Sequence, residues 1–312
     1  MRRLTQNPLL AAAFYAALGM SLLGFIDNFV RLVAEDIGLW QFHLTRTLIA
    51  FALIGPLVWY FGWIIRPRRV WAVALRSFFV ATAMILYFGS IAVLPIAEVA
   101  AGLFTSPLFV LVILTLGFGQ KIGPRRVFAA LFGFAGVLLI LRPDAAGLSL
   151  GSFVPVLAGF FYACGAVATK RLCEGEGTTA LLAGFFLFLG LWGLGGSLYF
   201  LLTGQGTDPA VDGFFGTGWQ PFTAQALFWT FAQAVVSLLG VGLITRGYQL
   251  ADASYVAVFE YAFLISAGFW AYMLWGDVPD WPALVGIAMI VVAGIVIIMR
   301  SKEPGLTARR PA

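Results

Sequence analysis

The sequence predicts an all-α integral membrane protein with ten transmembrane helices, arranged as two inverted-topology repeats of five helices. Of the 312 residues, 61% are hydrophobic and 11% are charged, whereas a soluble domain has about 25% charged residues. Apolar runs of about 20 residues, the length that spans a bilayer core, recur along nearly the whole chain. The runs lack the alternating polar pattern of barrel strands, so we expect helices, in which each backbone amide finds its partner within the segment.

Ten apolar runs define the expected spans. The first run, from about Pro8 to Val30, is too long for the apolar region of a signal peptide and predicts a retained first helix. The ten predicted spans cover residues 8–33, 37–64, 70–92, 96–118, 127–142, 151–170, 178–203, 223–249, 254–275 and 281–299.

Lysine and arginine residues predict the orientation of these spans. With the N-terminus in the cytoplasm, 14 of the 19 basic residues fall on the cytoplasmic side. They are Arg2, Arg3, Arg66, Arg68, Arg69, Lys121, Arg125, Arg126, Lys170, Arg171, Arg300, Lys302, Arg309 and Arg310. The opposite loops are mainly acidic, so the positive-inside rule places both termini in the cytoplasm. We expect a multi-pass protein of a cell membrane, with the bacterial inner membrane as its location.

The two halves of the chain show a weak internal similarity. An offset of 156 residues sets Leu94 to Ala97 against Leu250 to Ala253, and the apolar runs that follow stay in step. Two halves with five spans each insert in opposite orientations. We therefore expect one repeat in residues 1–145 and a second in residues 146–312, with a short cytoplasmic tail. Transporters built in this way commonly bind substrate between the repeats, near the membrane midplane.

Five short stretches resemble a known transporter family. They are residues 46–50 (RTLIA), 94–98 (LPIAE), 104–109 (FTSPLF), 119–126 (GQKIGPRR) and 133–137 (GFAGV). In these stretches the chain resembles the drug/metabolite transporter superfamily, in particular its ten-helix EamA-type members. The chain departs from the usual Gly-Glu after the fourth and ninth helices, where it has Gly119-Gln120 and Gly276-Asp277. The resemblance implies a carrier of amino acids, nucleoside-type metabolites or organic ions.

Polar residues inside the first two spans are candidate substrate-binding residues, because a charge at the bilayer centre costs at least about 2.5 kcal/mol and normally faces a cavity or a partner. The first span carries Asp27, Asn28 and Arg31, for which an interfacial cap at the helix end is the alternative. The second span carries His43 and Arg46. His43 is either a proton relay or a structural hydrogen-bonding group. Arg46 either holds a substrate carboxylate or pairs with Asp27.

The third and fourth spans add further candidates. Arg76 and Tyr87 lie along one stripe of the third span, and we expect Arg76 to snorkel towards the cytoplasmic interface. Glu98 and Thr105 share a face of the fourth span. Glu98 alternatively stabilises the positive end of its helix.

The second half contributes polar residues from the sixth, eighth and ninth spans. Tyr162 comes from the sixth span, and Gln233 and Ser237 form a polar face on the eighth, with Arg246 beyond them. We expect one cavity walled by the first, third, fourth, sixth, eighth and ninth helices, with the fifth and tenth outside it.

Glu260, beside Tyr261 in the ninth span, is the strongest candidate for a coupling or substrate-binding carboxylate. It lies about six residues into its helix, in the apolar stretch from Val256 to Phe259, where burial favours proton binding. A structural salt bridge with Arg246 or Arg46 is the alternative. The candidate proton-coupling residues are Glu260, Asp27, Glu98 and His43.

The expected function is secondary active transport by alternating access, because the chain has no GxxxxGK[ST] motif for nucleotide binding. The solute is a small organic metabolite that is amino-acid-like, zwitterionic or an organic ion, moved with protons or by exchange. The alternatives are a channel, a lipid scramblase or an intramembrane enzyme that uses Ser90 and His43. We expect that the protein is not an enzyme.

Several kinds of partner are not expected. We expect no cofactor, and the spacing of the two cysteines predicts no metal site. The basic residues stand in short clusters between apolar runs, so the net charge of +5 predicts no nucleic-acid partner. The lipid bilayer and a small solute are the expected partners of a monomer or a homodimer.

Overall fold

The computed structural model describes residues 7–90, 96–141, 151, 153–276 and 278–299, and every regular element in these ranges is a helix. The first half contains α2 (Pro8–Ile26), η1 (Asp27–Phe29), α3 (Val30–Ala34), α4 (Leu39–Phe61), α5 (Val70–Ser90), α6 (Ile96–Leu103), α7 (Ser106–Val112), η2 (Ile113–Gly117) and α8 (Pro124–Leu141). The second half contains α9 (Phe153–Arg171), α10 (Thr178–Thr203), α11 (Pro209–Gly216), α12 (Ala224–Leu250), α13 (Ala253–Val256), η5 (Ala257–Tyr261), α14 (Ala262–Trp275) and α15 (Trp281–Met299).

Eight segments of the described chain are long and apolar enough to cross a membrane. They are Pro8–Ala34, Leu39–Phe61, Val70–Ser90, Val99–Gly117, Phe153–Arg171, Thr178–Thr203, Ala224–Leu250 and Ala253–Leu274. Each coincides with a predicted span. The predicted spans 127–142 and 281–299 coincide with α8 and α15, which are not in this set, so the count of ten stays a prediction.

Local sequence signals begin and end these helices. The side chain of Asn7 accepts hydrogen bonds from the backbone N–H groups of Leu9 and Leu10, at 3.0 and 3.3 Å, which caps the start of α2. At their C-terminal ends, α4 is followed by Gly62 and α10 by Gly204, which cap the helices with a positive φ that glycine adopts without strain.

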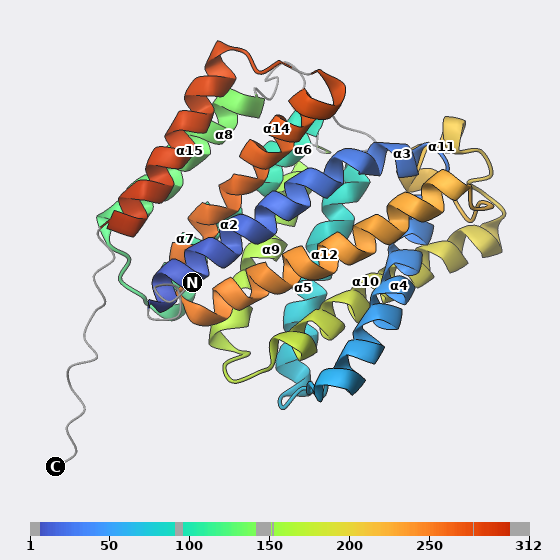
Figure 1. Cartoon of the computed structure of the whole chain (residues 1–312), viewed down its shortest axis with the longest axis horizontal. Coiled ribbons are helices and arrows are strands. Elements are labelled where there is room, and N and C mark those ends of the chain that lie inside the picture. Colours follow the sequence, from blue (N-terminus) through green and yellow to red (C-terminus); the bar gives the residue numbers. More distant parts are fainter. Residues whose placement is uncertain (1–6, 91–95, 142–150, 152, 277, 300–312) are drawn as a thin grey trace.

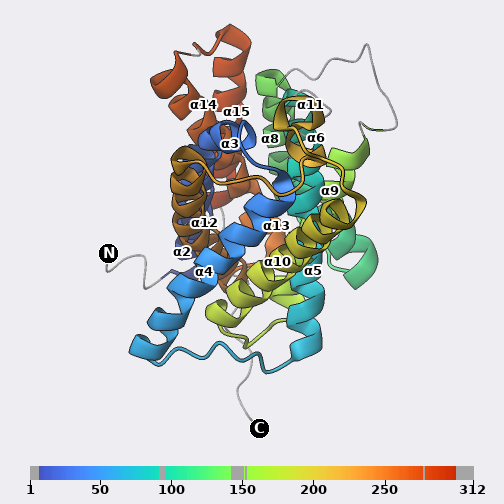
Figure 2. The same ribbon diagram turned by 90° about the vertical axis from the view of Figure 1, so that its right-hand side faces the viewer.

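The helices pack mainly in four pairs, α2 with α12, α5 with α9, α4 with α10 and α8 with α15. Figure 1 shows α2 beside α12 and the separate pair of α8 and α15, and Figure 2 shows α4 beside α10. Glycines allow the close approach. A Cβ atom at Gly19 would lie 2.6 Å from the carbonyl oxygen of Gly240, and one at Gly136 would lie 2.7 Å from that of Gly286. Small residues let membrane helices pack backbone against backbone in this way.

Within the described residues, three of the spans are interrupted. The first span passes through the 3₁₀ turn η1, and the fourth breaks between α6 and α7. The ninth span passes through the 3₁₀ helix η5. The chain therefore departs from a regular α-helix at each of these three places.

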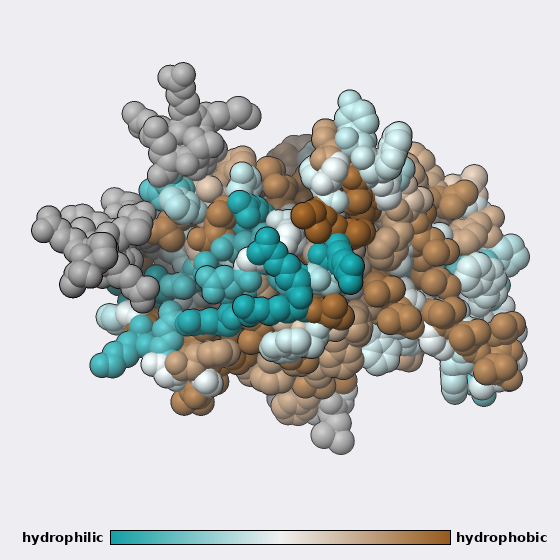
Figure 3. Space-filling model, turned by 90° about the horizontal axis from the view of Figure 1, so that it is seen from below, coloured by the Kyte–Doolittle hydropathy of each residue, from teal (hydrophilic) through white to brown (hydrophobic). Residues whose placement is uncertain are grey.

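Polar loops gather at one end of the bundle, which we call the basic end. The carboxylate of Glu176 accepts the backbone N–H groups of Arg68 and Arg69, at 2.9 and 2.6 Å, which joins the α4–α5 loop to the α9–α10 loop. Arg126 forms an ion pair with Asp252 at 3.3 Å. The two joined loops lie at the bottom of Figure 1, and Figure 3 shows hydrophilic residues in the middle of this face with hydrophobic residues around them.

Candidate functional site

A cavity lies in the centre of the bundle between helices of both halves. Its volume is about 80 Å³, enough for about five water molecules. The lining residues are Met20, Leu23, Asp27, Arg76, Val80, Met84, Tyr87, Phe88, Leu103, Phe104, Ser106, Tyr162, Ala166, Thr169, Phe185, Val241, Ile244, Thr245, Tyr248, Glu260 and Phe263. The wall comprises the six helices expected from the sequence and adds Phe185 of α10. No lining residue among those described comes from α8 or α15.

Glu260 lies in this cavity wall and is 1% exposed. Its Oε1 atom accepts hydrogen bonds from the hydroxyl groups of Tyr162 at 2.8 Å and Tyr248 at 2.7 Å. The three residues come from η5, α9 and α12, so the interaction exists only in the folded bundle. The two hydroxyls compensate part of the cost of burying a carboxyl group.

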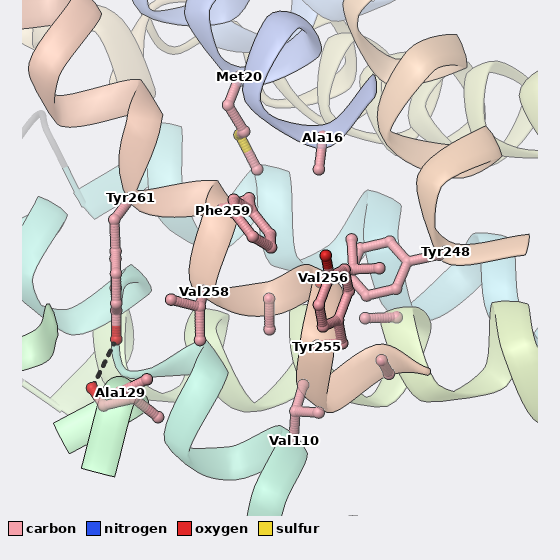
Figure 4. Packing of buried hydrophobic residues seen from close by; sticks show 14 of the residues in the cluster. Ala16, Met20, Val110, Ala129, Tyr248, Tyr255, Val256, Val258, Phe259 and Tyr261 are labelled. Carbon is pink, nitrogen blue, oxygen red and sulfur yellow. Dashed lines mark hydrogen bonds between the residues drawn. The ribbon is translucent and has the colours of Figure 1, made fainter. Parts of the chain in front are cut away.

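The expected alternative for Glu260 was a salt bridge. Arg246 instead is exposed and lines a separate polar pocket, and the one ion pair within 4.0 Å in the described chain is that of Arg126 with Asp252. Glu260 is therefore bound by neutral hydroxyl groups. Tyr261, its neighbour, points the other way, and its hydroxyl donates to the carbonyl oxygen of Ala130 at 3.2 Å (Figure 4).

Arg76 closes the cavity towards the basic end. Its Nε donates to the hydroxyl of Thr169 at 3.0 Å, and one terminal nitrogen donates to the hydroxyl of Thr245 at 3.0 Å. The other terminal nitrogen donates to the carbonyl oxygen of Leu181 at 3.1 Å. The expectation that Arg76 snorkels was wrong, because the side chain is 4% exposed and finds acceptors on three neighbouring helices. The guanidinium thus ties α5 to α9, α10 and α12.

We call Arg76 and its three acceptor residues, Thr169, Leu181 and Thr245, the Arg76 layer. A second, polar pocket of about 340 Å³ adjoins this layer on the side of the basic end. Thr169 lines both the pocket and the central cavity, and Arg246 follows directly after Thr245 in the chain. The remaining lining residues of the pocket are Lys170, Cys173, Glu174, Gly175, Glu176 and Gln249. The hydrogen bonds of Arg76 therefore separate the central cavity from a polar vestibule at the basic end.

A cluster of buried and partly buried polar residues borders the opposite end of the cavity. We call Asp27, His43, Arg46, Thr230 and Gln233 the Arg46 cluster. Asp27 lines the cavity and accepts a hydrogen bond from Nε2 of Gln233 at 3.0 Å. The ion pair of Asp27 with Arg46, one of the two alternatives for Arg46, is absent within 4.0 Å from the described contacts.

The aromatic surroundings of Arg46 complete this cluster. Its guanidinium carbon lies 5.1 Å from the ring centre of Phe42 and 6.0 Å from that of Phe88. Both nitrogens of the His43 ring, Nε of Arg46, Oε1 of Gln233 and the hydroxyl of Thr230 find no hydrogen-bond partner among the described residues.

The other candidate residues have different positions. Tyr87 lines the cavity. Asn28 donates to the carbonyl oxygens of Gly24 and Ala267, Thr105 donates to that of Gly102, and Ser237 donates to that of Ala234. These three side chains join or brace helices, and none of them lines the cavity. Arg31 is exposed, and the side chain of Glu98 lies outside the described residues.

Sequence reasoning missed several residues of the wall. Tyr248 lies two residues before the end of α12, where an interfacial tyrosine is ordinary, so no sequence signal marked it as the partner of Glu260. Thr245 directly precedes Arg246, and a single threonine within an apolar span carries no signal of its own. Ser106 is buried at the start of α7, directly before the proline that allows the helix to restart there.

The chain is similar to known membrane transporters. Residues 10–142 match the EamA-like transporter family. A pseudopaline exporter of Pseudomonas aeruginosa is 28% identical over 254 residues, covering 81% of this chain and 83% of the relative. A riboflavin transporter of Vibrio cholerae is 28% identical over 221 residues, covering 70% and 68%. An S-adenosylmethionine uptake transporter of Rickettsia bellii is 21% identical over 274 residues, covering 88% and 86%.

The fold also has a counterpart among solved structures. One crystal structure is similar to this chain with a TM-score of 0.72 at 19% sequence identity, covering 92% of this chain and 95% of the other. The likeness concerns the fold. The family matches confirm the resemblance that the sequence stretches indicated.

Proposed function

We propose, on the premise that this chain is an EamA-type transporter, that it moves a small organic solute by alternating access of one central cavity, with Glu260 as the proton- or solute-binding group. The observation that carries this proposal is the carboxyl group of Glu260, buried in the cavity wall and held by two tyrosine hydroxyls. Intramembrane carboxyl groups that line a cavity mark substrate and proton pathways.

The packing of the helices supports two inverted five-helix repeats. When the first five predicted spans are exchanged with the last five, the pair α2 and α12 becomes the pair α9 and α5, which also packs closely. The contact of α14 with α2 becomes that of α6 and α7 with α9. The pairs α4 with α10 and α8 with α15 map onto themselves. Such a pattern is expected for a two-fold relation between the halves.

The helix interruptions support the same relation. The break between α6 and α7 includes Phe104. Glu260, which lies 156 residues after Phe104, falls within η5. Interrupted helices at corresponding positions of two repeats indicate the binding site of a transporter. An odd number of spans in each repeat gives the halves opposite orientations, with both termini in the cytoplasm according to the positive-inside rule.

The cavity composition indicates the kind of solute. Aromatic and aliphatic side chains form most of the wall, and Glu260, Asp27 and Arg76 provide the charges. Such walls suit an organic molecule with an apolar body and a few polar groups. The present volume is too small for such a molecule, so solute binding requires a wider cavity than this closed arrangement offers.

Counterflow in proteoliposomes tests the proposal. Riboflavin and S-adenosylmethionine, the solutes named for two relatives, serve as first probes, followed by pools of amino acids and amines. A carrier shows saturable exchange, whereas a channel shows flux that does not saturate. If one proton moves with each solute, a gradient of one pH unit supports about tenfold accumulation, because one unit corresponds to about 1.4 kcal/mol.

The variant Glu260→Gln tests the role of the carboxyl group. Glutamine keeps an oxygen that accepts the two tyrosine hydroxyls but removes titration and charge. We expect the loss of gradient-driven accumulation, or of affinity for a cationic solute, in a folded protein. Glu35→Gln is the matched control, because Glu35 is exposed at the end of α3. Unchanged pH dependence and affinity in Glu260→Gln would remove Glu260 from the mechanism.

A further inference from the structure

The Arg46 cluster lies at the opposite end of the cavity from the Arg76 layer, and its polar groups are not satisfied within the protein. We propose that Arg46 and His43 form a second binding site, for an anionic group, so that the transported solute is an elongated zwitterion whose amino group binds Glu260. This inference rests on the proposed function, because it assigns the two ends of a solute in the same cavity.

The unpaired atoms of the cluster point to an anionic ligand. His43 is 0% exposed and Arg46 is 3% exposed, yet neither ring nitrogen of His43 nor Nε of Arg46 has a hydrogen-bond partner in the described chain. A buried guanidinium needs both charge compensation and acceptors for its N–H groups. A carboxylate supplies both, because it accepts several hydrogen bonds and carries the opposite charge.

Asp27 does not fill this role by itself. Its Oδ1 atom is engaged by Gln233, and it makes no ion pair with Arg46 within 4.0 Å. Thr230, one turn before Gln233 on α12, adds a further buried hydroxyl without a partner in the described chain. The cluster therefore has room in its hydrogen bonding for an additional acceptor group beside Asp27.

The cluster is continuous with the cavity. Asp27 and Phe88 both line the cavity, and the guanidinium carbon of Arg46 lies 6.0 Å from the ring centre of Phe88. The guanidinium therefore lies directly behind a residue of the cavity wall.

The separation between the two sites sets the length of the solute. Met20 lines the cavity and extends towards Phe259, the neighbour of Glu260 (Figure 4). Asp27 lies seven residues further along the first span, and a helix rises 1.5 Å per residue, which gives about 10 Å. An α-amino acid carries both charges on one carbon atom and is too short to bind at both ends. An ω-amino acid with about eight carbons matches the distance.

A length series on the purified, full-length protein tests this inference. Affinities are measured by isothermal titration for γ-aminobutyrate, ω-aminooctanoate, octylamine and octanoate. We expect ω-aminooctanoate to bind at least about tenfold more tightly than the short zwitterion and than either compound with one charge, because only it satisfies both sites. Equal affinity for octylamine and ω-aminooctanoate, or no binding of any probe, would overturn the anionic site.

Variants locate the effect. In Arg46→Gln we expect ω-aminooctanoate and octylamine to bind with about equal affinity, while binding of octylamine is retained. Arg31→Gln, at an exposed arginine outside the cavity, should keep the full preference. A preference that persists in folded Arg46→Gln contradicts the proposal. If that variant does not fold, the length series on the unchanged protein decides alone.

The two proposals fail in different ways. If Glu260-dependent, saturable transport is observed but no probe gains affinity from a carboxylate, the anionic site is wrong and the proposed function stands. If a zwitterion binds but counterflow is absent for every solute tested, the proposed transport is wrong and the second site stands.

Discussion

The hydrogen bond between Arg76 and Thr245 should help to keep the cavity closed towards the basic end. It joins α5 of the first half to α12 of the second half at 3.0 Å, and both side chains are buried. The change Thr245→Val removes the hydroxyl and keeps the shape of the side chain. We therefore expect the variant to open towards the basic end more often than the unchanged protein.

The structure allows the size of this effect to be worked out. A hydrogen bond with a charged donor contributes about 1.5 to 3 kcal/mol. In the proposed alternating-access cycle α5 separates from α12 in the open state, so the unchanged protein loses this bond on opening and the variant does not. The ratio of open to closed protein should then rise about 10- to 150-fold, since about 1.4 kcal/mol corresponds to a factor of ten.

Thiol labelling measures this ratio. Ala166 lines the cavity and is buried, so Ala166→Cys reports opening, in a background where Cys164 and Cys173 are replaced by serine. A membrane-impermeant maleimide added at the basic end should react at least about ten times faster in Thr245→Val than in its parent.

The control for this assay is Thr203→Val. The hydroxyl of Thr203 is exposed and donates only to carbonyl oxygens of its own helix, those of Tyr199 and Phe200. It should leave the labelling rate unchanged. If Thr245→Val remains folded and labels no faster than this control, the Arg76 layer is not a barrier to opening.

Two further predictions concern packing and cysteine reactivity. A Cβ at Gly24 would lie 2.5 Å from the carbonyl oxygen of Phe263, so Gly24→Ala should destabilise the protein by about 1 to 3 kcal/mol. A Cβ at Gly55 would have no neighbouring atom within 4 Å, so Gly55→Ala should not destabilise it. Thermal unfolding in detergent compares the two variants. Burial raises the pKa of the Cys173 thiol to about 11. In a Cys164→Ser background at pH 8, alkylation of Cys173 should therefore be far slower in the folded than in the unfolded protein. Equal alkylation rates would contradict this prediction.

The helices could be predicted from the sequence because the bilayer demands them. Segments such as Leu39–Phe61 and Thr178–Thr203 consist mainly of apolar residues over a span-length stretch, and hydrocarbon leaves such a stretch no alternative to internal hydrogen bonding. The helix interruptions were not predicted. The 3₁₀ turn at Ala257–Tyr261 contains no proline or glycine, so local sequence carried no sign of it.

The candidate site could be predicted in part. Glu260, Asp27, Tyr87 and Tyr162 stood out as polar groups at depth in apolar spans, and all four line the cavity. Arg76 was misjudged because its distance from the helix end allowed snorkelling. Sequence distance from the interface does not show which acceptors the neighbouring helices offer.

Composition and charge alone determined that this chain folds as membrane-spanning helices, because hydropathy and helix length are properties of each segment by itself. Tertiary structure decided which polar groups meet. Tyr162 and Tyr248 are 98 and 12 residues from Glu260, and only the packing of α9 and α12 against η5 brings both hydroxyls to one carboxylate oxygen. The same packing left the nitrogens of His43 and Nε of Arg46 without partners in the described chain. Partnership of buried polar groups depends on distances between helices, and those are set by side-chain packing across the whole bundle.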